Sequence, residues 1–442
     1  MRDLSRKRTG HARPALSVSH RVAAVRRPIS PIRKRIIVFA CAALVALILF
    51  STTEVTERHD GYDSDGVVYA MISSFPLLTL PTDIVPPFCY RILTPKIASL
   101  LPGVLLDRFR MIALGASMLS LFTLYMILRR LRFSDAECAL GVLLYAGVFW
   151  SVKFSFYSPA YIDHVTNLFL LLIIYCTVSE RFVSAIVLLA LSVLQKESLS
   201  MFSFFVAAEI WQQRTHRSGP RTWLLAAAAI IIPFACQSVF HRQYGAETPA
   251  IGTVIVSEAK RFLDPAFWPV FLHAAFSGLG LLPVLLVSRY RPWLAFLRQR
   301  PAFLVYLFIA GAALLGGIDK SRLFTYALPG VLFLSMENIH SLPAFRSRRA
   351  LPWLAVLLAG QWFIGNCLTP IGTFGEYLAK LVPEHSLGLG GTNHLPYLYR
   401  DVLIAAVLFG CTLQLVFADR AAGSDDRAAQ NEPNIAIHPP ND

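Results

Sequence analysis

Long apolar runs alternate with short polar segments along most of the chain. Each run is long enough, or nearly so, to cross the hydrocarbon core of a bilayer as a helix. The runs cover residues 36–52, 111–128, 138–152, 165–178, 182–194, 199–211, 222–240, 268–288, 302–316, 323–338, 351–368 and 400–418. The pattern predicts an all-α, polytopic transmembrane helical bundle of about 12 spans, within a range of 10–13. The runs 165–178 and 182–194 are short, and re-entrant or broken helices there would lower the count.

Every second loop between these runs is rich in arginine. The positive-inside rule places such loops in the cytoplasm, together with the N-terminus. The arginines concerned are Arg129, Arg130, Arg132, Arg181, Arg214, Arg217, Arg221, Arg289, Arg291, Arg298, Arg300, Arg346, Arg348 and Arg349. Both termini are therefore predicted to be cytoplasmic. The loops 53–110, 153–164, 195–198, 241–267, 316–322 and 369–399 are predicted to face the opposite side.

The two ends of the chain differ from the middle. Residues 1–35 are rich in Arg, Ser and Pro and predict a disordered basic cytoplasmic tail, and residues 419–442 predict a second disordered tail. The first apolar run lacks a cleavage site and predicts a retained anchor, with an organellar transit peptide as the alternative. Residues 36–418 then form one transmembrane domain, whose first outer loop is 53–110.

Composition supports this class. Hydrophobic residues make up 55% of the chain, charged residues 15%, and the mean hydropathy is +0.54, which excludes an ordinary soluble protein. The net charge of +14 lies in the tail and the short loops, so the predicted surroundings are membrane lipid and not nucleic acid. The cysteines show no disulfide framework or metal-ligand spacing, and no pattern indicates an oligomeric state.

The first outer loop opens with an acidic segment that contains Asp60, Asp63 and Asp65. From Val67 onward, apolar residues at helical intervals predict a helix in the membrane interface, with Asp65 and Tyr69 on one face. A carboxylate there can act as a general base or bind a divalent cation. The alternative is a solvated loop in which Asp65 caps the helix.

The string from Asp65 to Ala70, Asp-Gly-Val-Val-Tyr-Ala, resembles the Asp-Glu-x-x-Tyr-Ala motif of membrane glycosyltransferases. That motif belongs to the aminoarabinose and protein O-mannosyl transferase branch of the GT-C superfamily. The resemblance implies a GT-C-like fold with interfacial helices in the first outer loop, a polyprenyl-phosphate-linked sugar donor, and Asp65 as the catalytic base. Gly66 replaces the second acid of the motif, which leaves a paired-carboxylate or metal role open, with Asp63 or Asp60 as substitutes.

Arg91 lies between an aromatic residue and a proline in the string Tyr90-Arg91-Ile92-Leu93-Thr94-Pro95, where the chain returns toward the bilayer. An arginine can clamp a phosphate with two parallel hydrogen bonds, as a lipid-phosphate donor requires. The string resembles one in uncharacterised bacterial GT-C-like proteins. An arginine that snorkels from an interfacial segment is the alternative.

Two further outer segments place ionisable side chains at helix ends. Asp163 and His164 open the fourth predicted span, where either helix capping or a substrate contact explains them. Lys196 and Glu197 occupy a very tight turn, so they must pair, snorkel or face a wet cavity. Lys196 is a candidate to neutralise a phosphate leaving group.

Asp319, Lys320 and Arg322 lie between the ninth and tenth predicted spans, after Gly316 and Gly317. The glycines permit close approach of the backbone, and the two cations can contact an anionic head group. A short charged turn between helices is the alternative.

The remaining outer loops carry acids and histidines with a possible role in acceptor binding. They are His241, Glu247, Glu258, Glu376, Glu384, His385 and His394. No metal motif and no glycine-rich phosphate loop is visible among them. The sequence therefore predicts no cofactor with certainty, and a divalent cation stays open.

These features predict a glycosyltransferase of the bacterial inner membrane that acts on the non-cytoplasmic side. Asp65, Arg91, Lys196 and Arg322 are then expected to converge on one outward-opening cavity. A secondary transporter or a flippase for lipid-linked saccharides is the alternative, although no internal repeat is visible. A polymerase or ligase of surface polysaccharide is a third interpretation.

Overall fold

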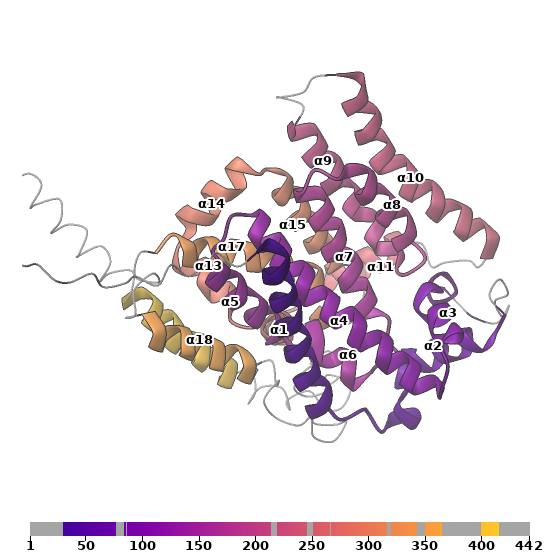
Figure 1. The fold of residues 1–442 in the computed structure, drawn as a ribbon, viewed down its shortest axis with the longest axis horizontal. Helices are drawn as coiled ribbons and strands as arrows, with labels where there is room; N and C mark the ends of the chain where they lie inside the picture. Colours follow the sequence, from indigo (N-terminus) through magenta and orange to yellow (C-terminus); the bar gives the residue numbers. More distant parts are fainter. Residues whose placement is uncertain are drawn as a thin grey trace, which may run out of the picture.

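The computed structural model describes residues 30–76, 84, 86–213, 219–244, 251–265, 267–315, 320–342, 350–364 and 399–414. Within these residues the secondary structure is helical, as the apolar runs predict (Figure 1). The helices pack around one large core of buried apolar side chains, and a smaller second core lies under the first outer loop. The all-α architecture is confirmed.

The N-terminal half carries the first outer loop and the helices that return from it. Its elements are α1 (Pro31–Thr52), η1 (Arg58–Gly61), α2 (Ser64–Ser74), η2 (Phe88–Tyr90), α3 (Leu93–Leu100), α4 (Leu105–Arg130), α5 (Asp135–Ala146), η3 (Phe149–Lys153), α6 (Phe154–Tyr157), α7 (Asp163–Val178), α8 (Phe182–Ser192), η4 (Glu197–Phe202) and α9 (Ser203–Gln213).

The C-terminal half adds a long edge helix and a series of shorter, bent elements. These are α10 (Pro220–Tyr244), α11 (Ile251–Arg261), α12 (Phe267–Leu279), α13 (Leu282–Ser288), α14 (Tyr290–Gln299), α15 (Ala302–Ala313), α16 (Lys320–Leu323), η5 (Phe324–Tyr326), α17 (Leu328–His340) and α18 (Leu351–Ile364). Residues 399–414 are also helical.

Three described helices, α1, α4 and α10, are long and apolar enough to cross a membrane. The number rises to six if each of three bent pairs counts as one span: α5 with the segment 149–157, α12 with α13, and α14 with α15. The protein therefore has the helices of a membrane protein. The larger count of about 12 spans stays a prediction.

The breaks lie at other places than the sequence indicates. The short helices α7 and α8 are continuous, whereas α12 and α13 meet at an angle of 100°. Gly280 lies at that break with a φ of +62°, and an added Cβ there would lie 2.3 Å from the amide of Gln361. The same Gln361 accepts a hydrogen bond from the backbone N–H of Leu281 at 2.7 Å. Only glycine fits this bend.

The first helix begins earlier than the apolar run indicates. Ser30 accepts a hydrogen bond from the backbone N–H of Arg33, and Pro31 occupies the first turn, which are the features of a helix start. Residues 31–35 therefore belong to α1 and not to the tail, which is a correction. The rest of the predicted first tail and the predicted second tail, 419–442, lie outside the described residues.

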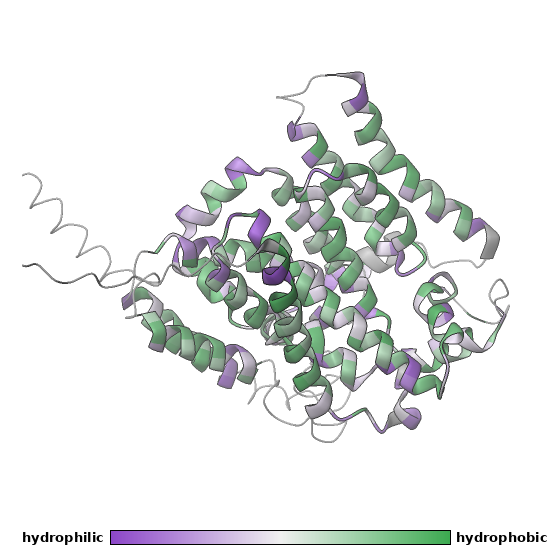
Figure 2. Ribbon diagram, in the orientation of Figure 1, coloured by the Kyte–Doolittle hydropathy of each residue, from purple (hydrophilic) through white to green (hydrophobic). Residues whose placement is uncertain are grey.

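Large apolar side chains cover the outside of the bundle. On α10, Leu224, Ile231 and Val239 are largely exposed, and Figure 2 shows hydrophobic residues along the length of this helix. Monomeric soluble proteins rarely expose apolar surface of this extent, whereas lipid tails match it. The exposed face of α10 is therefore suited to a bilayer.

Loops predicted on the same side of the membrane lie at the same end of the bundle. At one end Gln212 donates a hydrogen bond to the carbonyl of Gln299 at 2.7 Å. At the other end the backbone N–H of Leu93 donates to the carbonyl of Leu194 at 3.0 Å. The candidate site lies at this second end, near Leu93 and Leu194.

Candidate functional site

Asp65 lies in the first turn of α2, within the segment 53–110. The helix begins at Ser64, three residues before the predicted start at Val67, so Asp65 is inside the helix and does not cap it. Its side chain is 26% exposed.

Gly66 occupies the position at which the Asp-Glu-x-x-Tyr-Ala motif has its second acid, and the packing around it leaves no space for a side chain. An added Cβ at Gly66 would lie only 2.9 Å from the Cβ of Ala160. The close approach brings α2 against the segment that precedes α7. A glutamate at this position would have no room, so a carboxylate pair at 65 and 66 is incompatible with this packing.

Asp163 is the first residue of α7, but its carboxylate does not cap the helix. Its Oδ1 accepts a hydrogen bond from Lys196 Nζ at 2.9 Å, and its Oδ2 lies 3.7 Å from Arg322 Nη1. The side chain is only 8% exposed. The capping interpretation is therefore wrong, because the charge of this buried carboxylate is balanced by two cations from other elements.

Arg322 connects the buried part of the site to the open part. Its Nη1 donates a hydrogen bond to Asp65 Oδ2 at 3.3 Å, and the same nitrogen faces Asp163. The guanidinium also lies over the ring of Tyr161, 5.3 Å from its centroid. Burial and the charges of Asp65 and Asp63 raise the pKa of Tyr161, which keeps its phenol protonated beside the candidate base.

Arg91 forms the second half of the site with Glu197. Its Nη2 and Nε donate to the two carboxylate oxygens at 2.6 and 3.0 Å, which is the bidentate geometry of the strongest ion pairs. Its Nη1 donates to the hydroxyl of the buried Tyr69 at 3.4 Å. Of the three options that the sequence leaves open for Lys196 and Glu197, the structure shows pairing, each with a residue from another element.

The tight turn that carries Lys196 and Glu197 is fixed by its neighbour Gln195. The Gln195 carboxamide accepts a hydrogen bond from Thr94 at 2.7 Å and donates one to the carbonyl of Ile162 at 2.8 Å. These bonds join the turn to α3 and to the start of α7. Sequence reasoning missed this role, although a polar amide in an otherwise apolar turn was a usable signal.

Three acids and three bases make up what we call the charge cluster. Its members are Asp65, Arg91, Asp163, Lys196, Glu197 and Arg322. The structure brings Asp65, Arg91, Lys196 and Arg322 together through these ion pairs, and the outward-opening cavity expected there stays a prediction. The more exposed edge holds Asp65 and Arg322, and the buried interior holds Asp163 and Lys196.

The ion pairs keep the buried side chains of Glu197 and Lys196 in their charged forms. Burial alone would raise the pKa of Glu197, but the charge and hydrogen bonds of Arg91 lower it below the ordinary value. Burial alone would lower the pKa of Lys196, but the charge of Asp163 raises it. Both groups are therefore charged at neutral pH.

Tyr326 and Ser198 lie next to the charge cluster. Ser198 and Tyr326 share a hydrogen bond of 2.7 Å, and Lys196 Nζ lies 5.4 Å from the centre of the Tyr326 ring. Sequence reasoning missed Tyr326. It follows Arg322 by four residues, so one helical turn places both near the cluster.

Other predicted site residues have different surroundings. Lys320 is fully buried and donates to Glu258 at 2.7 Å, which removes it from contact with a head group. Asp63 is buried and accepts a hydrogen bond from Ser158 at 3.1 Å, so it anchors the loop. His164 is buried beside Asp163, and neither of its ring nitrogens forms a hydrogen bond.

Of the outer-loop residues assigned a possible acceptor role, His241 stacks on Tyr90 with ring centroids 4.1 Å apart, while Glu258 pairs with Lys320. The others lie outside the described residues, as does Asp319; they are Glu247, Glu376, Glu384, His385 and His394. Among the residues that the structure describes, no group of three or more His, Cys, Asp or Glu side chains could hold a metal ion.

No protein-family model and no curated protein matches this sequence.

Proposed function

We propose that the protein is an integral membrane glycosyltransferase of the GT-C type in the bacterial inner membrane. It moves a sugar from a polyprenyl-phosphate-linked donor to an acceptor on the non-cytoplasmic side, with both termini in the cytoplasm. The observation that carries the proposal is the position of Asp65 at an open edge, 3.3 Å from Arg322 and next to the buried pair of Asp163 and Lys196. The resemblance of the Asp65–Ala70 string supports it.

In the proposed reaction Asp65 takes the proton from an acceptor hydroxyl or amine. The acceptor atom attacks the anomeric carbon of the sugar, and the bond from that carbon to the phosphate oxygen breaks with its electron pair on the oxygen. The product is an inverted glycoside, and polyprenyl phosphate leaves as the anion. Asp65 then releases this proton to solvent, to which its side chain is partly exposed.

Arg322 is the residue best placed to meet the departing phosphate. It shares the exposed edge with Asp65, and a guanidinium carries five N–H donors, so it can contact a carboxylate and a phosphate together. Lys196 lies deeper and adds positive charge behind it through Asp163. Both charges act in a region of low dielectric constant, where they stabilise a developing anion strongly.

Asp163 and Glu197 have a positioning role in this account. Asp163 holds Lys196 and faces Arg322, and Glu197 holds Arg91 against Tyr69. Without these carboxylates the three cations would repel one another across the cluster. The ion pairs therefore hold Arg91, Lys196 and Arg322 in position before the donor binds.

The location of the cluster favours an enzyme over a transporter. Its members lie at helix starts and short turns at one end of the bundle: on α2, just after η2, at the start of α7, at the start of η4 and on α16. Transporters place such residues near the middle of the membrane, at broken helices related by repeats.

The test is release of polyprenyl phosphate from a labelled polyprenyl-phosphate sugar by the purified protein in proteoliposomes. We expect turnover of at least one donor in this class. If no such donor is consumed while a lipid-linked saccharide crosses the vesicle membrane, the protein is a flippase and the proposal is wrong.

A further inference from the structure

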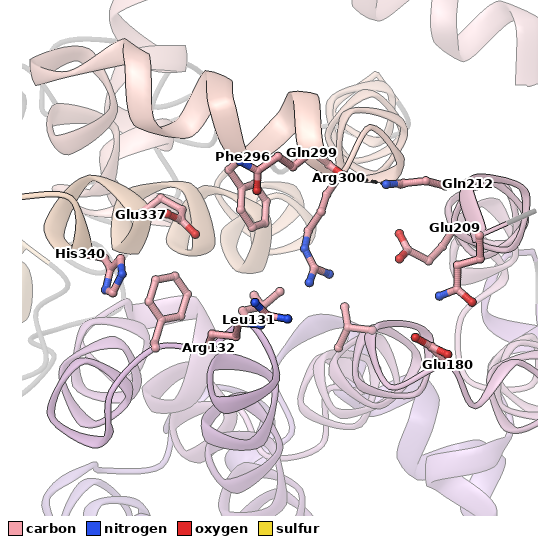
Figure 3. A pocket seen from close by; sticks show the side chains of 13 residues that line it. Leu131, Arg132, Glu180, Glu209, Gln212, Phe296, Gln299, Arg300, Glu337 and His340 are labelled. Carbon is pink, nitrogen blue, oxygen red and sulfur yellow. Dashed lines mark hydrogen bonds between the residues drawn. The ribbon is translucent and has the colours of Figure 1, made fainter. Parts of the chain in front are cut away.

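A polar cavity of about 500 Å³ lies at the end of the bundle opposite the charge cluster (Figure 3). The helix α7 joins the two places: it begins at Asp163 in the cluster and ends at Val178 on the cavity wall. Its 16 residues span about 24 Å, so the cavity is separate from the candidate site. The cavity lies among the loops that the arginine pattern predicts to be cytoplasmic.

Five helices end at the wall of the cavity. The residues at these ends are Leu131 after α4, Val178 of α7, Gln212 of α9, Gln299 of α14 and His340 of α17. The C-terminal end of a helix carries a partial negative charge from its last carbonyl groups. Five such ends around one space favour positive charge within it.

The charged side chains in the walls add to this potential. Glu180, Glu209 and Glu337 face two arginines, Arg132 and Arg300. No ion pair joins any of these glutamates to either arginine, although all five residues are described. The acidic and basic side chains thus remain separated across the cavity.

Glu209 is the residue that points most clearly to a ligand. Its side chain comes from the last turns of α9, the residue is 6% exposed, and its Oε2 has no hydrogen-bond partner. Figure 3 shows its carboxylate directed into the cavity, toward the guanidinium of Arg300 on the far wall. A buried carboxylate oxygen without a donor is strongly unfavourable, so a donor from a bound molecule is expected there.

We propose that this cavity binds a small organic cation of the amine class, with several N–H donors. Such a ligand satisfies Glu209, reaches Glu337 or Glu180, and complements the helix ends. An anion would meet three carboxylates, and a bare metal ion would need clustered ligands that the described residues do not provide. The volume suits a molecule of that size. The proposal does not depend on the glycosyltransferase activity.

Isothermal titration calorimetry tests the proposal. Spermidine is titrated into the purified full-length protein in detergent, and the heat of binding is measured. We expect saturable binding to one site that weakens at least tenfold in Glu209→Gln. Glu337→Gln is the second variant and is expected to weaken binding as well. The exposed Glu54 lies elsewhere, so Glu54→Gln is the matched control and should bind as the wild type does.

Arg300→Gln separates a cation site from an anion site. It removes a positive charge from the wall, so spermidine binding is expected to be unchanged or tighter. Saturable binding of inorganic phosphate that Arg300→Gln abolishes would overturn the proposal. So would the absence of saturable spermidine binding, or wild-type affinity in both glutamate variants.

Discussion

Arg322 Nη1 lies 3.3 Å from Asp65 Oδ2, although 257 residues separate the two in the sequence. The contact joins two distant parts of the chain at one end of the bundle, because Asp65 belongs to α2 and Arg322 to α16. It also sets the chemistry of the site. The guanidinium is held beside the carboxylate at the more exposed edge of the charge cluster, where the proposal places the leaving phosphate.

The bidentate pair of Arg91 and Glu197 predicts a difference between arginine and lysine. Arg91→Lys keeps the charge but loses the parallel hydrogen bonds and the contact with Tyr69. We expect a loss of about 1–2 kcal/mol in stability and a marked fall in turnover. The measurement is thermal unfolding of the purified protein in detergent. Arg130→Lys changes an exposed arginine and should have no effect; equal losses in both variants would contradict the assignment.

The lowered pKa of Glu197 predicts a loss of stability in acid. A carboxyl whose pKa is lower in the folded than in the unfolded protein stabilises the fold above its unfolded value, here about 4.5. That stability disappears as the pH falls through the lowered folded value. The thermal midpoint of the wild type should therefore exceed that of Glu197→Gln at pH 7, and the two should converge in acid. A difference that is the same at every pH would contradict the charged pair.

The close approach of Gly66 to Ala160 predicts a paired effect. Gly66→Ala places a methyl group within 2.9 Å of the Ala160 Cβ and should lower stability by about 1–3 kcal/mol. Adding Ala160→Gly removes the second methyl group, so the double variant should recover much of the loss. Additive losses in the thermal midpoint would show that the contact is not the cause.

The buried pair of Asp163 and Lys196 predicts that stability and activity can be separated. Asp163→Asn leaves Lys196 buried without its carboxylate, and we expect a loss of about 3 kcal/mol. Adding Lys196→Met removes the buried charge and should restore much of the thermal midpoint. Donor turnover should stay low in both variants, because the cation is misplaced in one and absent in the other. Restored turnover in the double variant would exclude a role for Lys196.

The sequence was sufficient to locate most apolar helices and to single out the six residues of the charge cluster, but not to say which of them pair, nor to find Gln195 and Tyr326 beside them. Apolar length located α4 and α10, and charged residues in tight outer turns identified Lys196 and Arg322. Which acid binds which base depends on packing between distant segments, so Lys196 was not assigned to Asp163. The burial of Lys320 was also invisible, since Glu258 lies 62 residues away.

The break at Gly280 shows a second limit. Hydropathy over 268–288 is continuous, so the sequence predicts one span where the structure has a bend of 100°. The bend depends on the positive φ of Gly280 and on the amide of Gln361, which comes from another helix. The hydropathy of residues 268–288 contains no information about a contact with Gln361 in another helix.

The central claim is that Asp65 is the catalytic base of a lipid-linked sugar transfer. The most direct test is the single-turnover release of polyprenyl phosphate by Asp65→Asn, compared with Asp107→Asn, which changes a more exposed carboxylate in the first turn of α4. Asparagine keeps the shape and the contact with Arg322 but cannot take a proton at neutral pH. We predict a loss of about 100-fold or more for Asp65→Asn and wild-type rates for Asp107→Asn. Wild-type turnover by a correctly folded Asp65→Asn protein would contradict the account.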